Sequence, residues 1–346
     1  SNFNGQYSSF SIELDDGGSI RFYAYYSDTW GIDPVNSTES ISCNSSYSFA
    51  TTSSGFMPIG NLNTAFTGTY DGNGYSINSL YISRDVPDFE VFNGAGIFGR
   101  LNGATIKNLT IRDATIQSNR DYVGTISGTS INSSLDTLSS VSANIQGVDY
   151  IGGLVGYSIN SQINSSRADS GQISGNIIQK NVGGLSGYQT ANVAESYSAM
   201  NIVAPNAQYV GGLFGEITSG VRIRNSYVIA DTISGNDKVS GAIGKATCFS
   251  SCGLTDSYSS VTYLAASAGS QASLLTESGG SNTTDTTSYA NNTVGEVSIS
   301  GGTTFTTEGV HSDSLKSISF LSGYDFTDSW GMSSSLNGGF PFLLWS

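Results

Sequence analysis

The chain has 346 residues, of which only 12% are charged, and its formal net charge is −14. This acidic balance, without any run of Lys or Arg, argues against partners such as nucleic acid or an anionic membrane surface. No stretch approaches 18 consecutive apolar residues, so the sequence predicts no membrane-spanning helix.

The first 55 residues differ in pattern from the rest. Two alternating segments, 10–14 and 19–26, flank a turn at 15–18, and this arrangement predicts a β-hairpin. We expect residues 1–55 to act as a cap or as an assembly segment, because an uncovered strand edge pairs readily with another chain.

From residue 56 onward the chain forms one repetitive unit, 56–346, with a glycine phrase that recurs from residue 95 to residue 244. The clearest copies are 151–156, 182–187 and 210–215. Three weaker copies bring the total to six. The same position of the phrase is occupied, in chain order, by Ala95, Gly124, Gly152, Gly183, Gly211 and Ser240. The steps between these residues are 29, 28, 31, 28 and 29. A constant interval of ~29 residues is the signature of a repeat architecture.

A second phrase keeps the same interval. It pairs apolar residues ten positions apart, in Ile106/Ile116, Leu135/Ile145, Ile163/Ile173, Val193/Val203, Ile223/Ile233 and Leu254/Leu264. Alternating β-branched and polar residues favour strands, and Gly and Asn permit tight corners between them. One such unit cannot bury its own apolar face, whereas a stack of units shares a core. The sequence therefore predicts an all-β fold, a parallel β-helix (solenoid) with the right-handed winding expected of parallel crossovers.

The two phrases together, VGGLxG followed by xIxNSYxxxxI, resemble the GLUG-motif repeat of secreted and surface bacterial proteins. The resemblance covers roughly residues 56–346, with a typical lead-in at 58–77 and a typical ending at 324–345. It implies an extracellular or cell-surface location. The family's arrays occur in adhesins, in hemagglutinin-like proteins and as accessory parts of peptidases, so the resemblance is informative about fold and much less about function.

The last segment, about 310–346, is rich in aromatic residues, and we expect it to cap the open end of the stack. A further hypothesis concerns assembly. Residues 28–31 (DTWG) echo 328–331 (DSWG), which is either coincidence or a sign that both ends carry related elements. In the second case Trp30, Trp330 and Trp345 would mark ends that meet head to tail between subunits of a filament.

The three cysteines are Cys43, Cys248 and Cys252. The short spacing of the last two favours a local disulfide at an enlarged corner. Further ligands that would make a metal site are absent nearby. Cys43 would then be a buried thiol or an intermolecular bridge.

Four tyrosines follow the repeat, Tyr197, Tyr227, Tyr258 and Tyr289, at spacings of 30, 31 and 31. We expect them to stack as a ladder on one face of the rod. If the rings point inward they fill core, and if they point outward they form flat platforms on which sugar rings could stack.

Catalytic signals are weak. Glu195, Asn225 and Asp256 occupy equivalent repeat positions, which is more typical of a solvated edge than of paired catalytic carboxylates. The single histidine, His311, lies beside Ser312 and Asp313, but adjacency along the chain does not make a catalytic triad, whose members meet in space, and a surface histidine is expected. The glycine phrases lack the Lys-Ser/Thr ending of a phosphate loop. No cofactor is indicated.

The sequence thus predicts a non-enzymatic extracellular protein used for adhesion or as a filament subunit, with itself, a surface glycan or a protein as partner. The alternatives are a carbohydrate-binding or polysaccharide-cleaving β-helix and, less favoured for want of a threonine ladder, an ice-binding rod.

Overall fold

The fold was analysed in a computed structural model. It describes residues 7–13, 19–25, 30–34, 55–84, 94–175, 177–178, 180–218, 220–248, 252–269, 271–272, 288–291, 309–310 and 312–346. The chain divides into two compact units, residues 1–53 and 54–346. His311 and Cys43 lie outside the described residues, as does the side chain of Trp30.

The first unit contains an antiparallel sheet of three strands in its described part. These are β1 (Tyr7–Glu13), β2 (Ser19–Tyr25) and β3 (Trp30–Pro34). Phe10 of β1 pairs with Phe22 of β2, so the predicted hairpin is present, and a third strand extends it. Its role as a cap or assembly segment stays a prediction.

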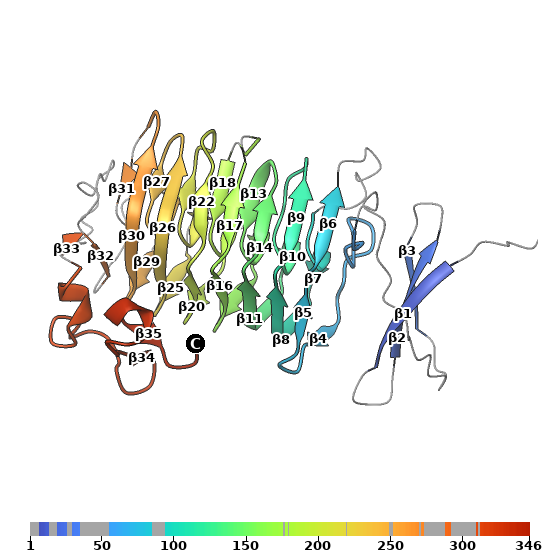
Figure 1. The fold of residues 1–346 in the computed structure, drawn as a ribbon, viewed down its shortest axis with the longest axis horizontal. Helices are drawn as coiled ribbons and strands as arrows, with labels where there is room; N and C mark the ends of the chain where they lie inside the picture. The colour runs from blue at the N-terminus through green and yellow to red at the C-terminus, as the bar shows by residue number, and fades with distance from the viewer. Residues whose placement is uncertain are drawn as a thin grey trace, which may run out of the picture. The chain divides into compact units, whose positions relative to one another are not determined.

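The second unit is a β-solenoid, in which short parallel strands stack coil upon coil (Figure 1). No α-helix occurs among its described residues. The described strands of the coils form a six-stranded sheet, a five-stranded sheet and one large sheet. The six-stranded sheet contains β7 (Phe98–Asn102), β10 (Ser127–Ile131), β14 (Val155–Ile159), β19 (Ser186–Gln189), β24 (Phe214–Thr218) and β28 (Ile243–Thr247). The five-stranded sheet contains β13 (Asp149–Gly152), β18 (Lys180–Gly183), β23 (Val210–Gly211), β27 (Val239–Ser240) and β31 (Gln271–Ala272).

The large sheet forms the remaining wall of every coil. Its strands are β4 (Thr69–Asp71), β5 (Ser76–Asn78), β6 (Tyr81–Arg84), β8 (Thr105–Arg112), β9 (Thr115–Ser118), β11 (Ser134–Val141), β12 (Asn144–Gln146), β15 (Gln162–Asn164), β16 (Arg167–Asp169), β17 (Gln172–Ser174), β20 (Val193–Ala194), β21 (Tyr197–Ser198), β22 (Asn201–Val203), β25 (Arg222–Arg224), β26 (Tyr227–Gly235), β29 (Gly253–Thr255), β30 (Tyr258–Ala266), β32 (Tyr289–Asn291) and β33 (Gly309–Val310).

The glycine phrase stacks in register, as predicted. The amide of Leu154 donates to the carbonyl of Leu185 at 3.0 Å, and that of Leu185 donates to Leu213 at 2.9 Å. All three leucines are fully buried in the core of the solenoid. A Cβ added to Gly184 would collide with the carbonyl of Gly212 in the next coil and with the side chain of Ser198. Glycine is therefore required here because neighbouring segments approach too closely for a side chain.

The second phrase also stacks, with one correction. Ile106, Leu135, Ile163, Val193, Ile223 and Leu254 form one continuous column. In the second column, however, Ile202 takes the expected place of Val203, between Ile173 and Ile233. Val203 is 41% exposed. The ten-residue spacing fails here because this coil is one residue shorter between its two large-sheet strands: Arg167 pairs with Tyr197, but Gln172 pairs with Asn201.

The NSY part of the repeat forms a corner. Glu195, Asn225 and Asp256 each adopt a left-handed backbone conformation, with φ of 49°, 46° and 48°. The serine that follows each corner is buried and bonds to the neighbouring coil. Ser196 Oγ, for example, accepts the amide of Ser166 at 3.2 Å and donates to the carbonyl of Ala194 at 2.8 Å. The residue after each of these serines is a tyrosine, Tyr197, Tyr227 or Tyr258, and its side chain points outward from the large sheet.

Residues 312–346, called the tail here, follow the last described coil strand. They contain the short 3₁₀ helices η2 (Ser314–Lys316) and η3 (Asn337–Gly339) and the two-residue strands β34 (Trp330–Gly331) and β35 (Phe342–Leu343). The β34 and β35 strands pair antiparallel. The tail lies along one side of the solenoid at its C-terminal coils (Figure 1).

Candidate functional site

The predicted tyrosine ladder exists on the outer face of the large sheet. The rings of Tyr197 and Tyr227 stack with centroids 4.6 Å apart, and those of Tyr227 and Tyr258 with centroids 5.1 Å apart and planes within 3°. Tyr289 continues the register. The next residue in each strand, such as Val228, belongs instead to the core inside the coils, because side chains alternate along a strand.

The tail covers this ladder. The indole ring of Trp330 contacts Tyr227 and Tyr258 at 5.8 and 5.9 Å, and Trp345 lies 6.2 Å from Tyr197. As a result the tyrosines are 6%, 3% and 1% exposed at 197, 227 and 258. Burial raises the pKa of Tyr258 well above its usual value. These rings are therefore not open platforms for a ligand.

The tail contacts also bear on the predicted assembly ends. Trp330 is fully buried against the chain's own ladder, so it is not available for a contact between subunits. Sequence reasoning went wrong here because an aromatic residue near a chain end does not reveal which surface of the same chain it packs against. Trp330 and Trp345 contact tyrosines of successive coils from the side of the solenoid, and end capping by this segment stays a prediction.

A second group of tyrosines lies on a different side of the solenoid and remains partly exposed. We call Tyr122, Tyr150, Tyr157 and Tyr188 the tyrosine patch; all four are half-buried. Tyr157 and Tyr188 are in register in β14 and β19, with stacked rings 4.8 Å apart. Tyr122 and Tyr150 stack at 5.2 Å, and Tyr122 and Tyr150 lie 5.3 and 5.0 Å from Tyr157.

The coil geometry explains why these rings meet. Tyr157 follows the last glycine of its phrase and points outward from the six-stranded sheet. Tyr150 precedes the same phrase and has a left-handed φ of 55°, as Tyr122 does at 63°. The two positions flank one glycine phrase, so their side chains emerge beside each other and repeat in the next coil. The sequence does contain a signal for this cluster, a Tyr just before or just after the glycine phrase. The cluster was not predicted from the repeat, because only some copies of the phrase carry such a Tyr.

Charged and amide groups border the tyrosine patch. Glu216 pairs with Lys245 at 3.0 Å and accepts a hydrogen bond from the Asn181 side chain at 3.0 Å. Lys245 also lies 4.7 Å from the ring centre of Tyr209. The pKa of Tyr150 is raised to about 12, mainly by burial and to a smaller extent by the neighbouring Tyr122 and Tyr157. The hydroxyl groups of the patch are therefore neutral hydrogen-bond donors at physiological pH.

Two carboxylates adjoin the patch on its other border. Asp121 and Asp149 each precede a patch tyrosine, and the amide of Tyr122 donates to the Asp149 carbonyl at 2.9 Å. Burial raises the pKa of both carboxyl groups, and the charge of Asp149 raises that of Asp121 further. Glu195, Asn225 and Asp256, which occupy equivalent positions in successive repeats, form coil corners instead. The side chain of Asn225 also forms hydrogen bonds with Ser329 and Trp330 of the tail.

Partly exposed aromatic faces with hydrogen-bonding groups at their edge are suited to stacking against the apolar face of a sugar ring. In the described part of the chain, no group of three or more His, Cys, Asp or Glu side chains is placed to hold a metal ion. The same residues include no helix that is long and apolar enough to cross a membrane.

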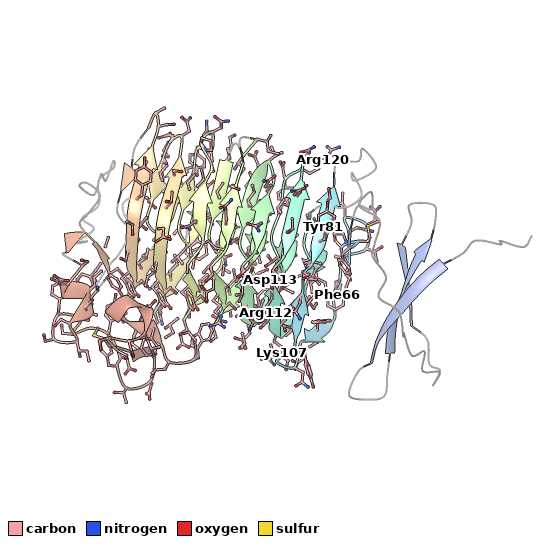
Figure 2. All side chains as sticks on the ribbon, in the orientation of Figure 1. Phe66, Tyr81, Lys107, Arg112, Asp113 and Arg120 are labelled. Carbon is pink, nitrogen blue, oxygen red and sulfur yellow. A yellow bond between two sulfur atoms is a disulfide. The ribbon has the colours of Figure 1, made fainter. Side chains whose placement is uncertain are left out.

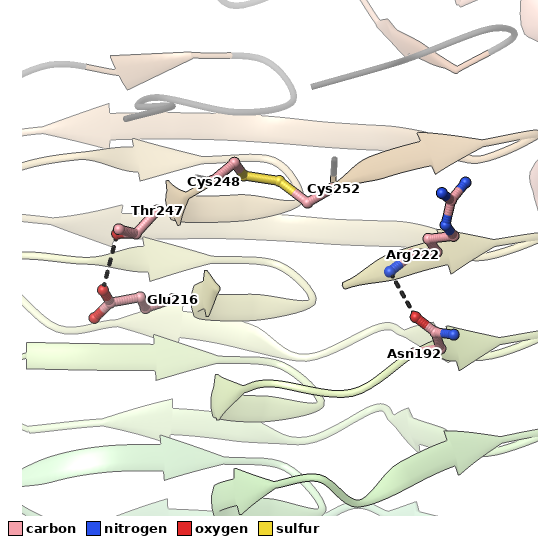
Figure 3. Close-up of a disulfide and its surroundings, with 6 residues drawn as sticks. All are labelled: Asn192, Glu216, Arg222, Thr247, Cys248 and Cys252. Carbon is pink, nitrogen blue, oxygen red and sulfur yellow. Dashed lines mark hydrogen bonds between the residues drawn. A yellow bond between two sulfur atoms is a disulfide. The ribbon is translucent and has the colours of Figure 1, made fainter. Parts of the chain in front are cut away.

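The structure contains a Cys248–Cys252 disulfide, which joins the residue after β28 to the residue before β29 (Figure 3). Both cysteines are buried in the solenoid core. Thr247, next to the bridge, donates to Glu216 at 3.4 Å. The disulfide therefore fixes the corner after β28. The strand that pairs with β28 is β24, which carries Glu216, one of the charged residues beside the tyrosine patch.

Comparison with known proteins gives limited information. No protein-family model matches the chain. A segment of 92 residues, 26% of the chain, is 40% identical to Halomucin from Haloquadratum walsbyi. The chain spans about 1% of the length of that relative. Among solved structures, a candidate immunoglobulin A1 protease from Bacteroides ovatus is similar over 82% of this chain and 88% of its own, with 14% identity and a TM-score of 0.47.

Proposed function

We propose that this chain is a non-enzymatic, extracellular adhesion rod of the GLUG-repeat type, which binds surface carbohydrate through the tyrosine patch. The observation that carries the proposal is the half-buried cluster of four tyrosines that contact one another across successive coils. A rigid scaffold holds these rings in fixed positions, so a glycan gains stacking contacts at little cost in side-chain entropy.

Three further observations support the extracellular and GLUG-type parts of this proposal. Both phrases that resemble the GLUG repeat stack in register in neighbouring coils. The chain carries a disulfide, which is typical of proteins in oxidising compartments. The partial similarity to Halomucin agrees with a secreted or surface protein.

A glycan array followed by calorimetric titration of the best hit tests the proposal. The double variant Tyr157→Ala/Tyr188→Ala removes one stacked pair, and we expect its affinity to fall about tenfold or more, the loss of roughly one aromatic stacking contact per ring. The matched control is Tyr75→Ala with Tyr263→Ala, which removes two tyrosines that are 71% and 58% exposed outside the patch. Equal affinity of the double variant and the control would exclude the patch as the binding surface.

A second candidate function, cleavage of the bound polysaccharide, is favoured by Asp121 and Asp149. Carboxyl groups whose pKa is raised by burial are candidates for general acid or base catalysis when they lie beside a ligand site. The discriminating experiment is a turnover assay on the glycans that bind. Product formation that disappears in the Asp149→Asn variant would support an enzyme, whereas binding without product supports an adhesion module.

A further inference from the structure

One outward-facing column of the large sheet changes character along the rod. It runs in register through Ser76, Thr110, Ser139, Arg167, Tyr197, Tyr227, Tyr258 and Tyr289. The tyrosine half is the ladder that the tail covers. At Arg167 the column becomes polar, and there the tail reaches its last described residues, Trp345 and Ser346. In Figure 1 the C mark lies nearest the labels of β20 and β35, and β16, the strand that carries Arg167, belongs to the coil before β20.

A hollow of about 380 Å³ occupies this junction. Arg167 and Ser139 line it from the column, Trp345 lines it from the tail, and Asn73, Asn108 and Thr137 line it from neighbouring corners. Its size is at the lower end of the range of about 300–1,000 Å³ typical of small-molecule sites. Lys107 lies on the same side of the rod, at its lower edge in Figure 2.

Arg167 is held in a fixed orientation and still has free donors. Its Nε donates to Ser139 Oγ at 2.7 Å, and its Nη1 donates to the Tyr197 hydroxyl at 3.2 Å. A guanidinium group has five N–H donors, so donors remain for a ligand. Among the described residues, Arg167 forms no ion pair.

Arg167 is the one cationic side chain that lines the hollow. No lining side chain is a carboxylate; Ser346, which also lines the hollow, carries the terminal carboxylate of the 346-residue chain, and this group forms no ion pair with Arg167 among the described residues. Asp71, next to the hollow, is already paired with Lys107 at 3.1 Å and accepts the Asn108 side-chain amide at 2.9 Å. Asp169 accepts the Tyr197 hydroxyl at 3.5 Å and does not line the hollow. An oriented arginine that forms no ion pair among the described residues is a suitable partner for a carboxylate, because the planar fork binds both of its oxygens.

We propose that this hollow is a binding site for one acidic sugar unit, a hexuronate. The carboxylate binds Arg167, and the apolar face of the pyranose ring packs on the partly exposed indole of Trp345. Asn73, Asn108 and Thr137 supply hydrogen bonds to the hydroxyl groups. This site is separate from the tyrosine patch and does not depend on the function proposed for it.

Calorimetric titration of the 346-residue chain with glucuronate tests the proposal, with glucose and acetate as comparison ligands. We expect glucuronate to bind more tightly than either, because glucose lacks the charge and acetate lacks the ring. Arg167→Met is expected to weaken glucuronate binding about 10- to 100-fold, the usual effect of losing hydrogen bonds to a charged group. Arg120→Met, which removes an exposed arginine at the opposite edge of the solenoid from Lys107 in Figure 2, is the matched control and should bind as the unmodified chain does.

Two additional variants keep the test decisive. Trp345→Ala retains the charge and should weaken glucuronate without affecting acetate. Arg167→Lys retains the charge but not the fork, and serves if Arg167→Met proves unstable in a thermal melt; it too should bind more weakly. The proposal is overturned if glucose or acetate binds as tightly as glucuronate, or if the stable Arg167 variant retains full affinity. Loss of glycan binding in the Tyr157→Ala/Tyr188→Ala variant, with unchanged glucuronate binding, would separate this site from the patch.

Discussion

The indole Nε1 of Trp330 donates a hydrogen bond to the side-chain oxygen of Asn225, 3.3 Å away, across a sequence separation of 105 residues. Asn225 is a coil corner and Trp330 belongs to the tail, so this bond and the ring contacts around it attach the tail to the solenoid. The attachment is mostly apolar, because Trp330 joins a buried cluster with Tyr227, Tyr258 and Leu343.

Replacing Trp330 with Ala should therefore destabilise the protein strongly. We expect the free energy of unfolding to fall by about 3–5 kcal/mol, the usual cost of deleting a buried Trp or Phe side chain. Chemical denaturation followed by circular dichroism measures this. Tyr263→Ala, at a 58% exposed ring, is the control and should change stability by no more than about 0.5 kcal/mol. An unchanged unfolding midpoint for Trp330→Ala would contradict the attachment described here.

Stability should decrease in alkaline solution because of the covered ladder. Burial raises the pKa of Tyr258 well above its usual value of 10.0 and also raises that of Tyr227. Above pH 10 the unfolded chain loses phenol protons that the folded chain keeps. The stabilising contribution is therefore complete below pH 10 and is lost as the pH rises through the folded-state values.

Unfolding free energies measured from neutral pH to about pH 11 check this sign. The Tyr258→Phe variant has one fewer such group, and its stability should decline less steeply above pH 10. If every tyrosine of the folded protein ionised together near pH 10, as followed by phenolate absorbance, the ladder could not be buried as described.

The serine that follows each corner should contribute to stability through its bonds between coils. Ser196→Ala removes the acceptor of the Ser166 amide in a buried environment, so we expect a loss of about 1–3 kcal/mol from the unsatisfied donor. Ser319→Ala, at an exposed position in the tail, is the matched control. Equal melting temperatures for the two variants would show that these hydroxyl groups are not needed for stacking.

The glycine phrase makes a comparable prediction about close packing. Gly184→Ala places a methyl group against the carbonyl of Gly212 and the side chain of Ser198, and we expect destabilisation of at least about 1–3 kcal/mol from overpacking. Gly68→Ala is the control, because its added methyl group would meet only the movable ring of Phe66, at 3.3 Å. Thermal melts of both variants compare them directly, and a tolerated Gly184→Ala would refute the steric explanation for the glycine at this position.

The interval of the repeats was sufficient to predict the coils. Leu154, Leu185 and Leu213 lie in register because each coil bonds to the next, so residues one interval apart must become neighbours. The stacking of Tyr197 on Tyr227 follows in the same way. The prediction failed at Val203, where a coil shortened by one residue moves Ile202 into the core, since a single deletion reverses which side chains of a strand face inward.

The sequence alone therefore determined the solenoid, its registers outside the coil of Val203 and the existence of the tyrosine ladder, since these depend on periodic, nearest-neighbour interactions. Only the tertiary structure decided that the tail covers the ladder, that Tyr122 and Tyr157 meet on another side, and that Arg167 faces a hollow beside Trp345. The physical reason is that the tail has no repeat. Where it packs depends on the fit of its side chains to a surface formed by residues far away in the chain, such as Tyr197 beneath Trp345, and no interval in the sequence encodes that fit.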